Sequence, residues 1–422
     1  MRESRKSGIE SAGGVSVRGG RVLAGAAAAW LWFRPSNDLS AALLSLAGLY
    51  ALWRWRSALA AWRNPTGVFF GLGALWAMLS ATWSFDPAGT VRDLLHAAPV
   101  ALAAMAVPVI FDRPGRIWSA LVVSAALVTA RLGFDLIRLV SVLGWPTVLT
   151  EARFHHPYLY THPNVSSMMA GLCALVFFSR GMAGAPGAWR KGGLALGLAL
   201  DAAYVVTMAS RGPQLVLAAV VLAFPLVLAP GWRARLAAAA AAAAVAFALW
   251  EGIPRVNPRF RDRTMGDFNQ RDTVWGHSKL LADRRPLRGY GFGKTAFEKA
   301  FYENPEQRAP RVPFHYPHAH SYWLMLYFQG GAVGFALWGL GWLTLGIRLV
   351  RSAARAERIE SGWRGKLRAR ILPALLGTGL AFILIYGIGD YPDQAIRLSQ
   401  FCLAGLAVAL ASVPVRPKAG VA

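Results

Sequence analysis

The sequence has few charged residues for its length. Charged side chains make up 16% of the 422 residues and hydrophobic ones 55%, whereas a soluble globular chain is about 25% charged. This shortage excludes an ordinary soluble domain and points to a lipid environment. Cysteine is scarcer still: Cys173 and Cys402 both lie inside apolar runs, so neither a disulfide framework nor a thiolate metal site is expected.

The charges that are present are mostly positive. Lys and Arg number 45 and Asp and Glu 21, which gives a formal net charge of +24. In a soluble protein this excess would suggest nucleic acid, but in so apolar a chain membrane topology explains it better, and we expect no nucleic-acid partner. A basic stretch precedes the first apolar run, as in a signal peptide. Many further runs follow it, so we interpret this run as a retained helix.

Long apolar runs dominate the chain. A membrane helix needs about 20 mainly apolar residues, and about twelve segments meet this requirement. They are centred near Ala28, Leu46, Leu75, Leu102, Val123, Leu172, Leu198, Val220, Ala243, Leu337, Leu380 and Ala407. The expected fold class is therefore an all-α integral membrane protein of about 12 transmembrane helices. Residues 1–250 hold the first nine, residues 251–318 a large, mainly helical loop, and residues 319–422 helices 10 to 12 with a tail.

Basic residues in the short connections orient these helices. The connections after predicted helices 2, 4, 6, 8 and 10 are rich in Lys and Arg, and the last of them carries eight between Arg348 and Arg370. The opposite short turns are poor in both. The positive-inside rule therefore places both termini in the cytoplasm, and both long connections, residues 142–161 and 251–317, on the outer side. Of the eight histidines, only His96 is expected away from that side.

The large outer loop is itself basic, with thirteen Lys and Arg against eight Asp and Glu between residues 251 and 317. Long translocated segments escape the positive-inside rule, so the excess suggests an anionic partner. Proline positions predict two loop helices, Asn269–Asp283 and Lys294–Asn304. Arg271 and Trp275 share a face of the first. They form either a stacked surface pair or an arginine that an aromatic wall holds toward phosphate oxygens.

A glycine-rich run connects these two loop helices. Gly289, Gly291 and Gly293 offer backbone N–H groups just before Lys294, which would suit the lining of a phosphate site. The run follows no strand and lacks the spacing of a Walker or dinucleotide-binding loop. A plain turn between two helices is therefore the other interpretation.

Three histidines, His315, His318 and His320, stand at the exit of the loop. They have no acidic or thiolate ligand at a matching spacing and no H-E-x-x-H pattern, so we expect no metal site, and zinc is only the weaker alternative. His320 directly precedes the tenth apolar run. The membrane surface desolvates it in part there but leaves it reachable from outside, which suits a general base.

Further polar residues fall at the same outer level. Arg211 ends the seventh apolar segment, where an ionisable side chain is costly unless it is functional or snorkels to the interface. Asp390, between the last two segments, suits a partner for a histidine or an arginine. His162 opens the sixth segment, whose exposed amides favour an anion, and Arg153 adds positive charge just before it.

The order of these features resembles the O-antigen ligases of Gram-negative bacteria, in a superfamily that also holds O-antigen polymerases and PglL-type oligosaccharyltransferases. The resemblance rests on the twelve-span plan, the loop between helices 9 and 10, and short motifs. These motifs are Ser210-Arg211-Gly212, Arg271-x-x-x-Trp275, the Gly289–Gly293 run and His320-Ser321-Tyr322. The family commonly has His-Asn at the loop exit where this chain has His320-Ser321, so the role of the Asn neighbour does not carry over.

The resemblance implies a GT-C-like glycosyltransferase of the bacterial inner membrane. Its donor would be O-polysaccharide on undecaprenyl diphosphate, and its acceptor a sugar hydroxyl of the lipid A core, on the periplasmic side. Transfer would invert the anomeric carbon and need no metal or other cofactor.

The resemblance also assigns roles to residues. Arg211 and Arg271 would stabilise the departing diphosphate, with Arg153 and Lys294 as lesser candidates. His320 would take the acceptor proton, tuned by Asp390 or His318. The remaining substrate-binding candidates are His162, Trp275, Gly291 and Tyr322.

Three other functions remain as alternatives. A polymerase of the same superfamily joins one lipid-linked repeat to another and needs the same arginines. A protein oligosaccharyltransferase would need a protein acceptor, and the C-terminal region that often goes with one is short here. A twelve-span transporter of an organic anion is the third. Against it, the positive groups crowd the outer surface, and no pair of broken helices stands in matching halves.

Overall fold

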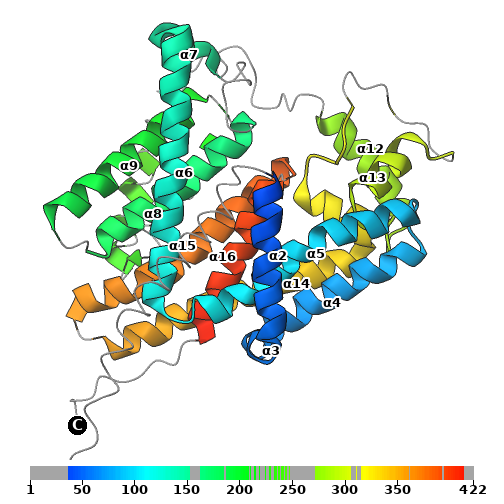
Figure 1. The fold of residues 1–422 in the computed structure, drawn as a ribbon, viewed down its shortest axis with the longest axis horizontal. Helices are drawn as coiled ribbons and strands as arrows, with labels where there is room; N and C mark the ends of the chain where they lie inside the picture. The colour runs from blue at the N-terminus through cyan, green and yellow to red at the C-terminus, as the bar shows by residue number, and fades with distance from the viewer. Residues whose placement is uncertain are drawn as a thin grey trace, which may run out of the picture.

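The computed structural model describes residues 37–152, 162–184, 187–208, 210, 271–305, 310, 315–360, 362–391 and 394–412, and isolated positions between 213 and 247. In these residues the chain forms helices and their connections, with no strand (Figure 1). The expected all-α class is therefore confirmed. Arg153 and Arg211 lie outside the described residues.

Each of the longer helices contains fifteen residues or more. These are α2 (Asn37–Trp53), α4 (Pro65–Leu79), α5 (Pro87–Ile110), α6 (Pro114–Leu143), α8 (Pro163–Met182), α9 (Ala188–Thr207), α14 (Tyr322–Ile359), α15 (Gly362–Gly389) and α16 (Gln394–Ser412). The shorter elements are α3 (Trp55–Trp62), η1 (Ser80–Thr82), α7 (Trp145–Glu151), α12 (Arg271–Arg284) and α13 (Lys294–Tyr302).

Several of these helices are long and apolar enough to cross a bilayer. Among the described residues six meet that requirement: α4 with η1, α5, α6, α8, α14 and α15. The expected span centres from Leu46 to Leu198, and from Leu337 to Ala407, all fall inside helices. The expected centre at Ala28 lies outside the described residues, and those at Val220 and Ala243 fall where only isolated positions are described. The chain is thus a multi-pass helical membrane protein, and the number twelve stays a prediction.

Local sequence explains where these helices begin. Proline occupies the first turn of α4, α5, α6 and α8, where its missing N–H costs nothing. The side chain of Ser321 caps α14 by accepting a hydrogen bond from the N–H of Leu324 at 3.3 Å. The His162 ring caps α8 by accepting one from the N–H of Asn164 at 3.3 Å.

The long helix α14 is broken at Gly331. Its φ of 61° is left-handed, a conformation that glycine adopts without the cost other residues meet. The backbone groups freed by the break bond to the connection between α12 and α13. The bonds are Ala332 N to Pro286 O (2.7 Å), Val333 N to Leu287 O (3.4 Å), Tyr290 N to Phe328 O (2.9 Å) and Gly291 N to Gln329 O (3.0 Å).

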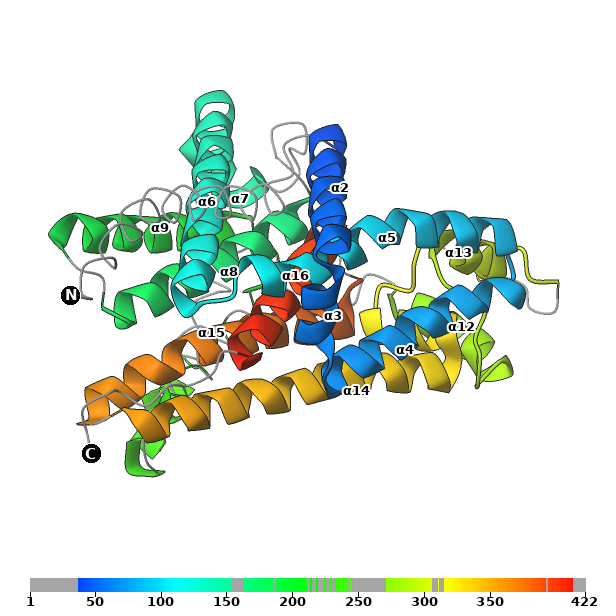
Figure 2. The same cartoon turned by 60° about the horizontal axis from the view of Figure 1, so that its bottom comes forward.

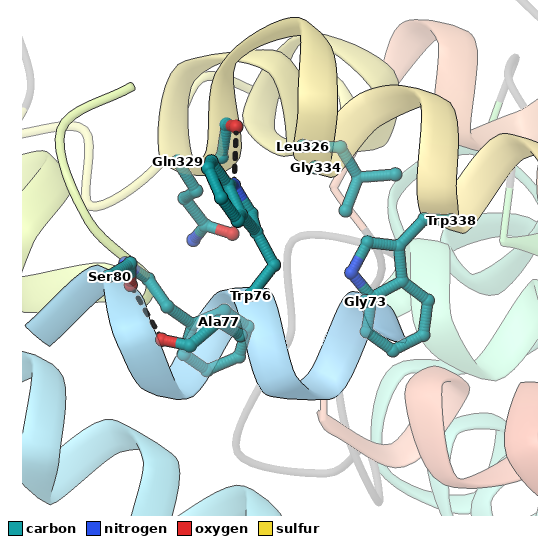
Figure 3. Close-up of a pocket in the computed structure, with 10 residues that line it drawn as sticks. Gly73, Trp76, Ala77, Ser80, Leu326, Gln329, Gly334 and Trp338 are labelled. Carbon is teal, nitrogen blue, oxygen red and sulfur yellow. Dashed lines mark hydrogen bonds between the residues drawn. The ribbon is translucent and has the colours of Figure 1, made fainter. Parts of the chain in front are cut away.

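The carbonyl of Gly330, next to the break, is also satisfied. Trp76 of α4 donates its indole N–H to this oxygen at 2.9 Å, as the dashed line in Figure 3 shows, beside a small pocket between α4 and α14. In both general views α4 runs alongside α14 (Figure 2). The N-terminal part of α14 is therefore tied both to the loop and to α4.

The two loop helices, α12 and α13, pack on the C-terminal end of α4, the N-terminal end of α5 and the start of α14 (Figure 1). Both begin within two residues of the expected positions. Their apolar faces share a buried cluster with the start of α14, in which Tyr290 and Phe297 contact Phe328 with ring centroids 4.9 Å apart. The carboxylate of Asp93 on α5 accepts hydrogen bonds from Thr295 N and Oγ1 at 3.1 and 2.8 Å. The described part of this loop is thus docked on the helices of the fold.

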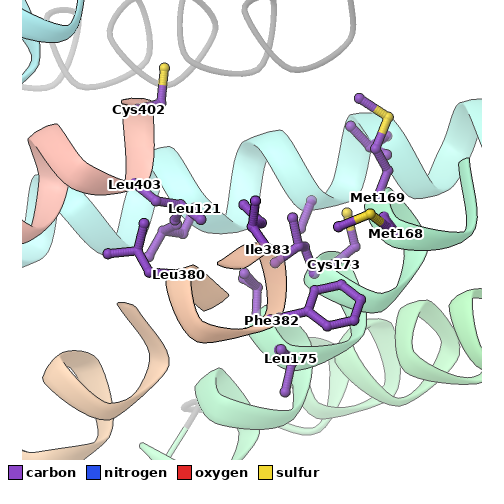
Figure 4. Close-up of a cluster of buried hydrophobic side chains, with 14 of the residues drawn as sticks. Leu121, Met168, Met169, Cys173, Leu175, Leu380, Phe382, Ile383, Cys402 and Leu403 are labelled. Carbon is purple, nitrogen blue, oxygen red and sulfur yellow. The ribbon is translucent and has the colours of Figure 1, made fainter. Parts of the chain in front are cut away.

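The second apolar core lies where α6, α8, α15 and α16 meet. Figure 4 shows Met168 and Cys173 of α8 facing Phe382 and Ile383 of α15. Both cysteines, Cys173 and Cys402, are buried and free of disulfides, as expected. Because α8 packs among α6, α15 and α16, the position of its first residues relative to the end of α15 is fixed.

Candidate active site

Four segments that are distant in sequence meet around Asp390. They are the residues after α15, the residues before α14, the start of α8 and the start of α12. Because α14 and α15 run antiparallel, His320 and Asp390 lie at one end of the pair and the basic residues from 348 to 370 at the other. The backbone is tied there as well, since the Tyr322 N–H donates to the Asp390 carbonyl at 3.2 Å.

The Asp390 carboxylate binds one cationic and one imidazole side chain. Its Oδ2 lies 3.3 Å from Nη2 of Arg271, and its Oδ1 lies 3.1 Å from Nδ1 of His320. Arg271 also donates from Nη1 to the carbonyl of Gly389. Asp390 is only 8% exposed. One buried carboxylate therefore positions both of the predicted catalytic side chains that the structure describes.

Neutral donors complete the shell of this carboxylate. The Tyr386 hydroxyl donates to Oδ2 at 2.6 Å, the Asn164 side-chain amide donates to the same oxygen at 3.3 Å, and the Tyr391 N–H donates to Oδ1 at 2.9 Å. The Ser210 hydroxyl in turn donates to the Asn164 side-chain oxygen. Ser210 is the neighbour of Arg211, so Asn164 connects Asp390 to the segment that carries the third predicted catalytic residue.

These contacts determine the charge of Asp390. Burial by itself would raise the pKa of its carboxyl, but the hydrogen bond with His320 and the charge of Arg271 act against burial. The net effect holds the pKa of Asp390 well below its usual range. Asp390 is thus ionised at every pH at which the protein would work.

His320 has an unusual backbone that several contacts maintain. Its φ of 49° is the only positive value among the non-glycine residues that the structure describes, and such values cost free energy unless the surroundings enforce them. Trp275 donates its indole N–H to the His320 carbonyl at 3.2 Å, and the His320 N–H donates to Nδ1 of His318 at 3.3 Å. This backbone aims the imidazole at Asp390.

The contacts of His320 also define its free nitrogen. An ionised carboxylate can only accept hydrogen bonds, so the proton of the neutral imidazole lies on Nδ1, toward Asp390. The Nε2 atom then carries the lone pair. The side chain is 22% exposed, and a ring nitrogen with a lone pair can accept a proton.

Other predicted residues lie near this cluster in different roles. Trp275 ties α12 to the start of α14 through the bond to His320. His318 contacts the His320 ring, with centroids 4.3 Å apart. His162 caps α8. Tyr322 is buried, and its hydroxyl accepts a hydrogen bond from Trp342 at 3.2 Å, so it supports the start of α14.

Gly291 and Lys294 are not part of the Asp390 cluster. The N–H of Gly291 donates a hydrogen bond to the carbonyl of Gln329. A Cβ atom added at Gly291 would lie only 2.2 Å from Oγ of Ser84. Lys294 begins α13 and is exposed. These contacts favour the interpretation of the glycine run as a turn, required because it packs against the break in α14.

The three histidines of the loop exit do not converge. His315 bonds Glu298 at 3.2 Å, while His318 and His320 face each other. In the part of the chain that is described, no group of three or more His, Cys, Asp or Glu residues is placed to hold a metal ion.

Sequence reasoning missed Asn164, Tyr386 and Ser210. Tyr386 stands one helical turn before Asp390, a spacing that could have indicated the contact. Asn164 lies in the segment singled out for its helix start, and Ser210 adjoins Arg211. The pairing of Asn164 with Ser210 and Asp390 joins segments 46 and 226 residues apart, which no local pattern indicates.

Replacing Asp390 with asparagine tests how much its charge contributes to stability, because the two side chains have nearly the same shape. We expect Asp390→Asn to lower the free energy of unfolding by about 3–5 kcal/mol, since Arg271 would lose its buried counter-ion. The ionised carboxylate stabilises the folded protein above pH about 4, and this contribution is lost only as pH falls through the lowered pKa. Thermal unfolding in detergent at pH 5 and 7 should therefore show the same deficit relative to wild type.

Asp272→Asn is the matched control for this experiment. Asp272 is exposed and adjoins Arg271 on α12, so the same charge is removed nearby. Its stability should stay within about 0.5 kcal/mol of wild type. Equal stability of both variants would mean that the Asp390 interactions contribute little.

The apolar spans and the Arg–Asp–His cluster at one end of them define a multi-pass membrane protein with a polar site where the helices meet the segment that carries α12 and α13. In a comparison with protein-family models, residues 196–339 match the family Wzy_C, described as O-antigen ligase. The match is consistent with the superfamily of O-antigen ligases and polymerases, as the sequence motifs predict. No curated protein matches the chain.

The matched segment runs from α9 through the outer loop into α14. It contains Arg211, Arg271, Trp275 and His320. Asp390 and Asn164 lie outside it, yet the structure brings both to the same cluster. The family segment and the flanking helices therefore build one site together.

Proposed function

We propose that the protein is a glycosyltransferase that joins O-antigen polysaccharide from undecaprenyl diphosphate to the lipid A-core oligosaccharide. The observation that carries this proposal is the single buried carboxylate, Asp390, that bonds both Arg271 and His320. A fixed cation and an oriented base, side by side at the end of membrane-spanning helices, suit a lipid-linked donor and a hydroxyl acceptor. The family match at residues 196–339 supports the same class of reaction.

Arg271 serves the leaving group. In the transfer the bond between the anomeric carbon and the diphosphate oxygen breaks, and negative charge grows on the diphosphate. A guanidinium that is already held by Asp390 and the Gly389 carbonyl needs little reorganisation to stabilise that charge. Arg211, which the resemblance assigns to the same task, adjoins Ser210 of the cluster. Arginine charges would then supply the stabilisation without a metal ion.

His320 serves the acceptor. As the hydroxyl oxygen attacks the anomeric carbon from the face opposite the diphosphate, its proton passes to Nε2 of His320. The imidazolium that results is stabilised by Asp390, which already bonds Nδ1. Attack from the opposite face inverts the configuration of that carbon. Cleavage of the bond between the sugar and the diphosphate supplies the free energy, so no nucleotide site is required.

The membrane arrangement follows from the distribution of charge. The basic connection between α14 and α15 would lie in the cytoplasm, which puts the Asp390 cluster on the periplasmic side of the inner membrane, with both termini inside. The apolar spans would hold the prenyl chain of the donor and the acyl chains of lipid A. The basic outer loop would face the phosphates of both lipids.

A deletion experiment separates the ligase from the polymerase of the same superfamily. Cells without the protein should accumulate long lipid-linked polymer and carry uncapped lipopolysaccharide. Single-repeat lipopolysaccharide would instead identify a polymerase, and loss of sugars from a surface protein would identify an oligosaccharyltransferase. Ion-driven uptake of an organic anion into proteoliposomes would favour a transporter.

A further inference from the structure

The last turns of α14 carry a row of exposed arginines at the end opposite the Asp390 cluster. Arg351, Arg355 and Arg358, the arginine stripe, are spaced by four and three residues and so share one side of the helix. All three are exposed. Over seven residues the stripe extends about 10 Å along the helix axis.

The stripe begins where the lipid-facing surface of α14 ends. Leu343, Ile347 and Val350 are 57%, 40% and 70% exposed, as expected for side chains that face acyl chains. Ile347 precedes Arg351 by four residues, so the apolar surface and the stripe continue each other along one side of the helix. The change from Val350 to Arg351 therefore marks the boundary of the hydrocarbon core.

The acidic residues close to the stripe have other partners. Glu357 bonds Arg370 of α15, with Nε of the arginine at 2.8 Å from the carboxylate, and Glu360 is engaged in another interaction. Arg355 donates to the carbonyl of Ala411 at the end of α16 at 3.4 Å. Among the described residues, no ion pair neutralises Arg351, Arg355 or Arg358.

We propose that the arginine stripe binds the headgroups of anionic phospholipids in the leaflet at that end of α14. Exposed guanidinium groups just beyond the hydrocarbon boundary lie at the level of the lipid phosphates. A guanidinium binds a phosphate through two parallel N–H···O hydrogen bonds, as it binds a carboxylate. The binding would hold the α14–α15 pair at a defined depth in the membrane, independently of the glycosyl transfer proposed above.

The experiment compares lipid binding by purified full-length variants in a non-ionic detergent. Phosphatidylglycerol or phosphatidylcholine is titrated in, and bound lipid is counted by native mass spectrometry. Wild type should prefer phosphatidylglycerol. The double variant Arg351→Gln/Arg358→Gln, which spares the contact of Arg355 with α16, should bind phosphatidylglycerol more weakly by a factor on the order of ten, with unchanged phosphatidylcholine binding.

Arg284→Gln/Arg288→Gln is the charge-matched control. Both arginines are exposed at or just after the end of α12, which contacts the start of α14, away from the stripe, and their loss lowers the net charge equally. This variant should keep the preference for phosphatidylglycerol. An equal loss in both variants, no loss in the stripe variant, or displacement of phosphatidylglycerol by inorganic phosphate at similar concentration would each overturn the proposal.

Discussion

His320→Ala is expected to reduce glycosyl transfer by a factor on the order of 10² to 10⁴, the range of general-base contributions, while donor binding stays within a few-fold of wild type. The reason is that His320 offers Nε2 to the acceptor proton, whereas the donor diphosphate is held by arginine. Transfer should be measured with purified protein in proteoliposomes, and donor binding separately in the absence of acceptor.

His315→Ala is the control for this variant. His315 lies five residues away and bonds Glu298 on the outer loop, so the same side chain is removed at the same loop exit without touching the cluster. Its transfer rate should match that of wild type. Unchanged turnover by His320→Ala, or a loss that comes entirely from weaker donor binding, would remove His320 from the role of base.

Arg271→Ala should lose transfer by a factor on the order of 10² to 10³, the usual effect of removing one donor that stabilises transition-state charge. Arg271→Lys should recover only part of this loss. A lysine keeps the charge but presents a single point in place of the planar fork, and it would have to satisfy both Asp390 and the Gly389 carbonyl. The measurement is the rate at saturating acceptor over a range of donor concentrations.

Arg284→Ala separates this effect from a general loss of positive charge. Arg284 is exposed in the last turn of α12, at the other end of this helix from Arg271. Its variant should transfer at a rate close to wild type. If Arg271→Ala and Arg284→Ala lost equally, the charge of the loop as a whole would matter, and a specific role of Arg271 would be wrong.

Local patterns in the sequence predicted the elements that carry the site. Proline positions predicted both loop helices, and the apolar runs predicted the six described helices that are long and apolar enough to cross a bilayer. The outer position of Asp390 indicated a partner for a histidine or arginine, and the structure makes it the partner of both. The positions of the helices depend on residues close together in the chain, whereas the Asp390 prediction named only the type of partner and left the particular residues open.

What the sequence could not show depends on contacts between distant segments. The left-handed backbone of His320 requires Trp275 and His318 to be placed around it. The sequence left both a phosphate lining and a plain turn open for the glycine run, because the break in α14, which uses the backbone groups of the run, cannot be located without the packing. Asn164 and Asp390 are 226 residues apart in the sequence, so no local pattern could indicate their contact.

The central claim is that fixed arginine charge and an aspartate-oriented histidine perform the transfer without a metal ion. Its most direct test is ligation by the purified protein, with lipid-linked polysaccharide as donor and rough lipopolysaccharide as acceptor, in buffer containing EDTA. The account predicts transfer at the rate seen without EDTA, and none by His320→Ala under the same conditions. Loss of activity in EDTA that added zinc or magnesium restores would contradict it.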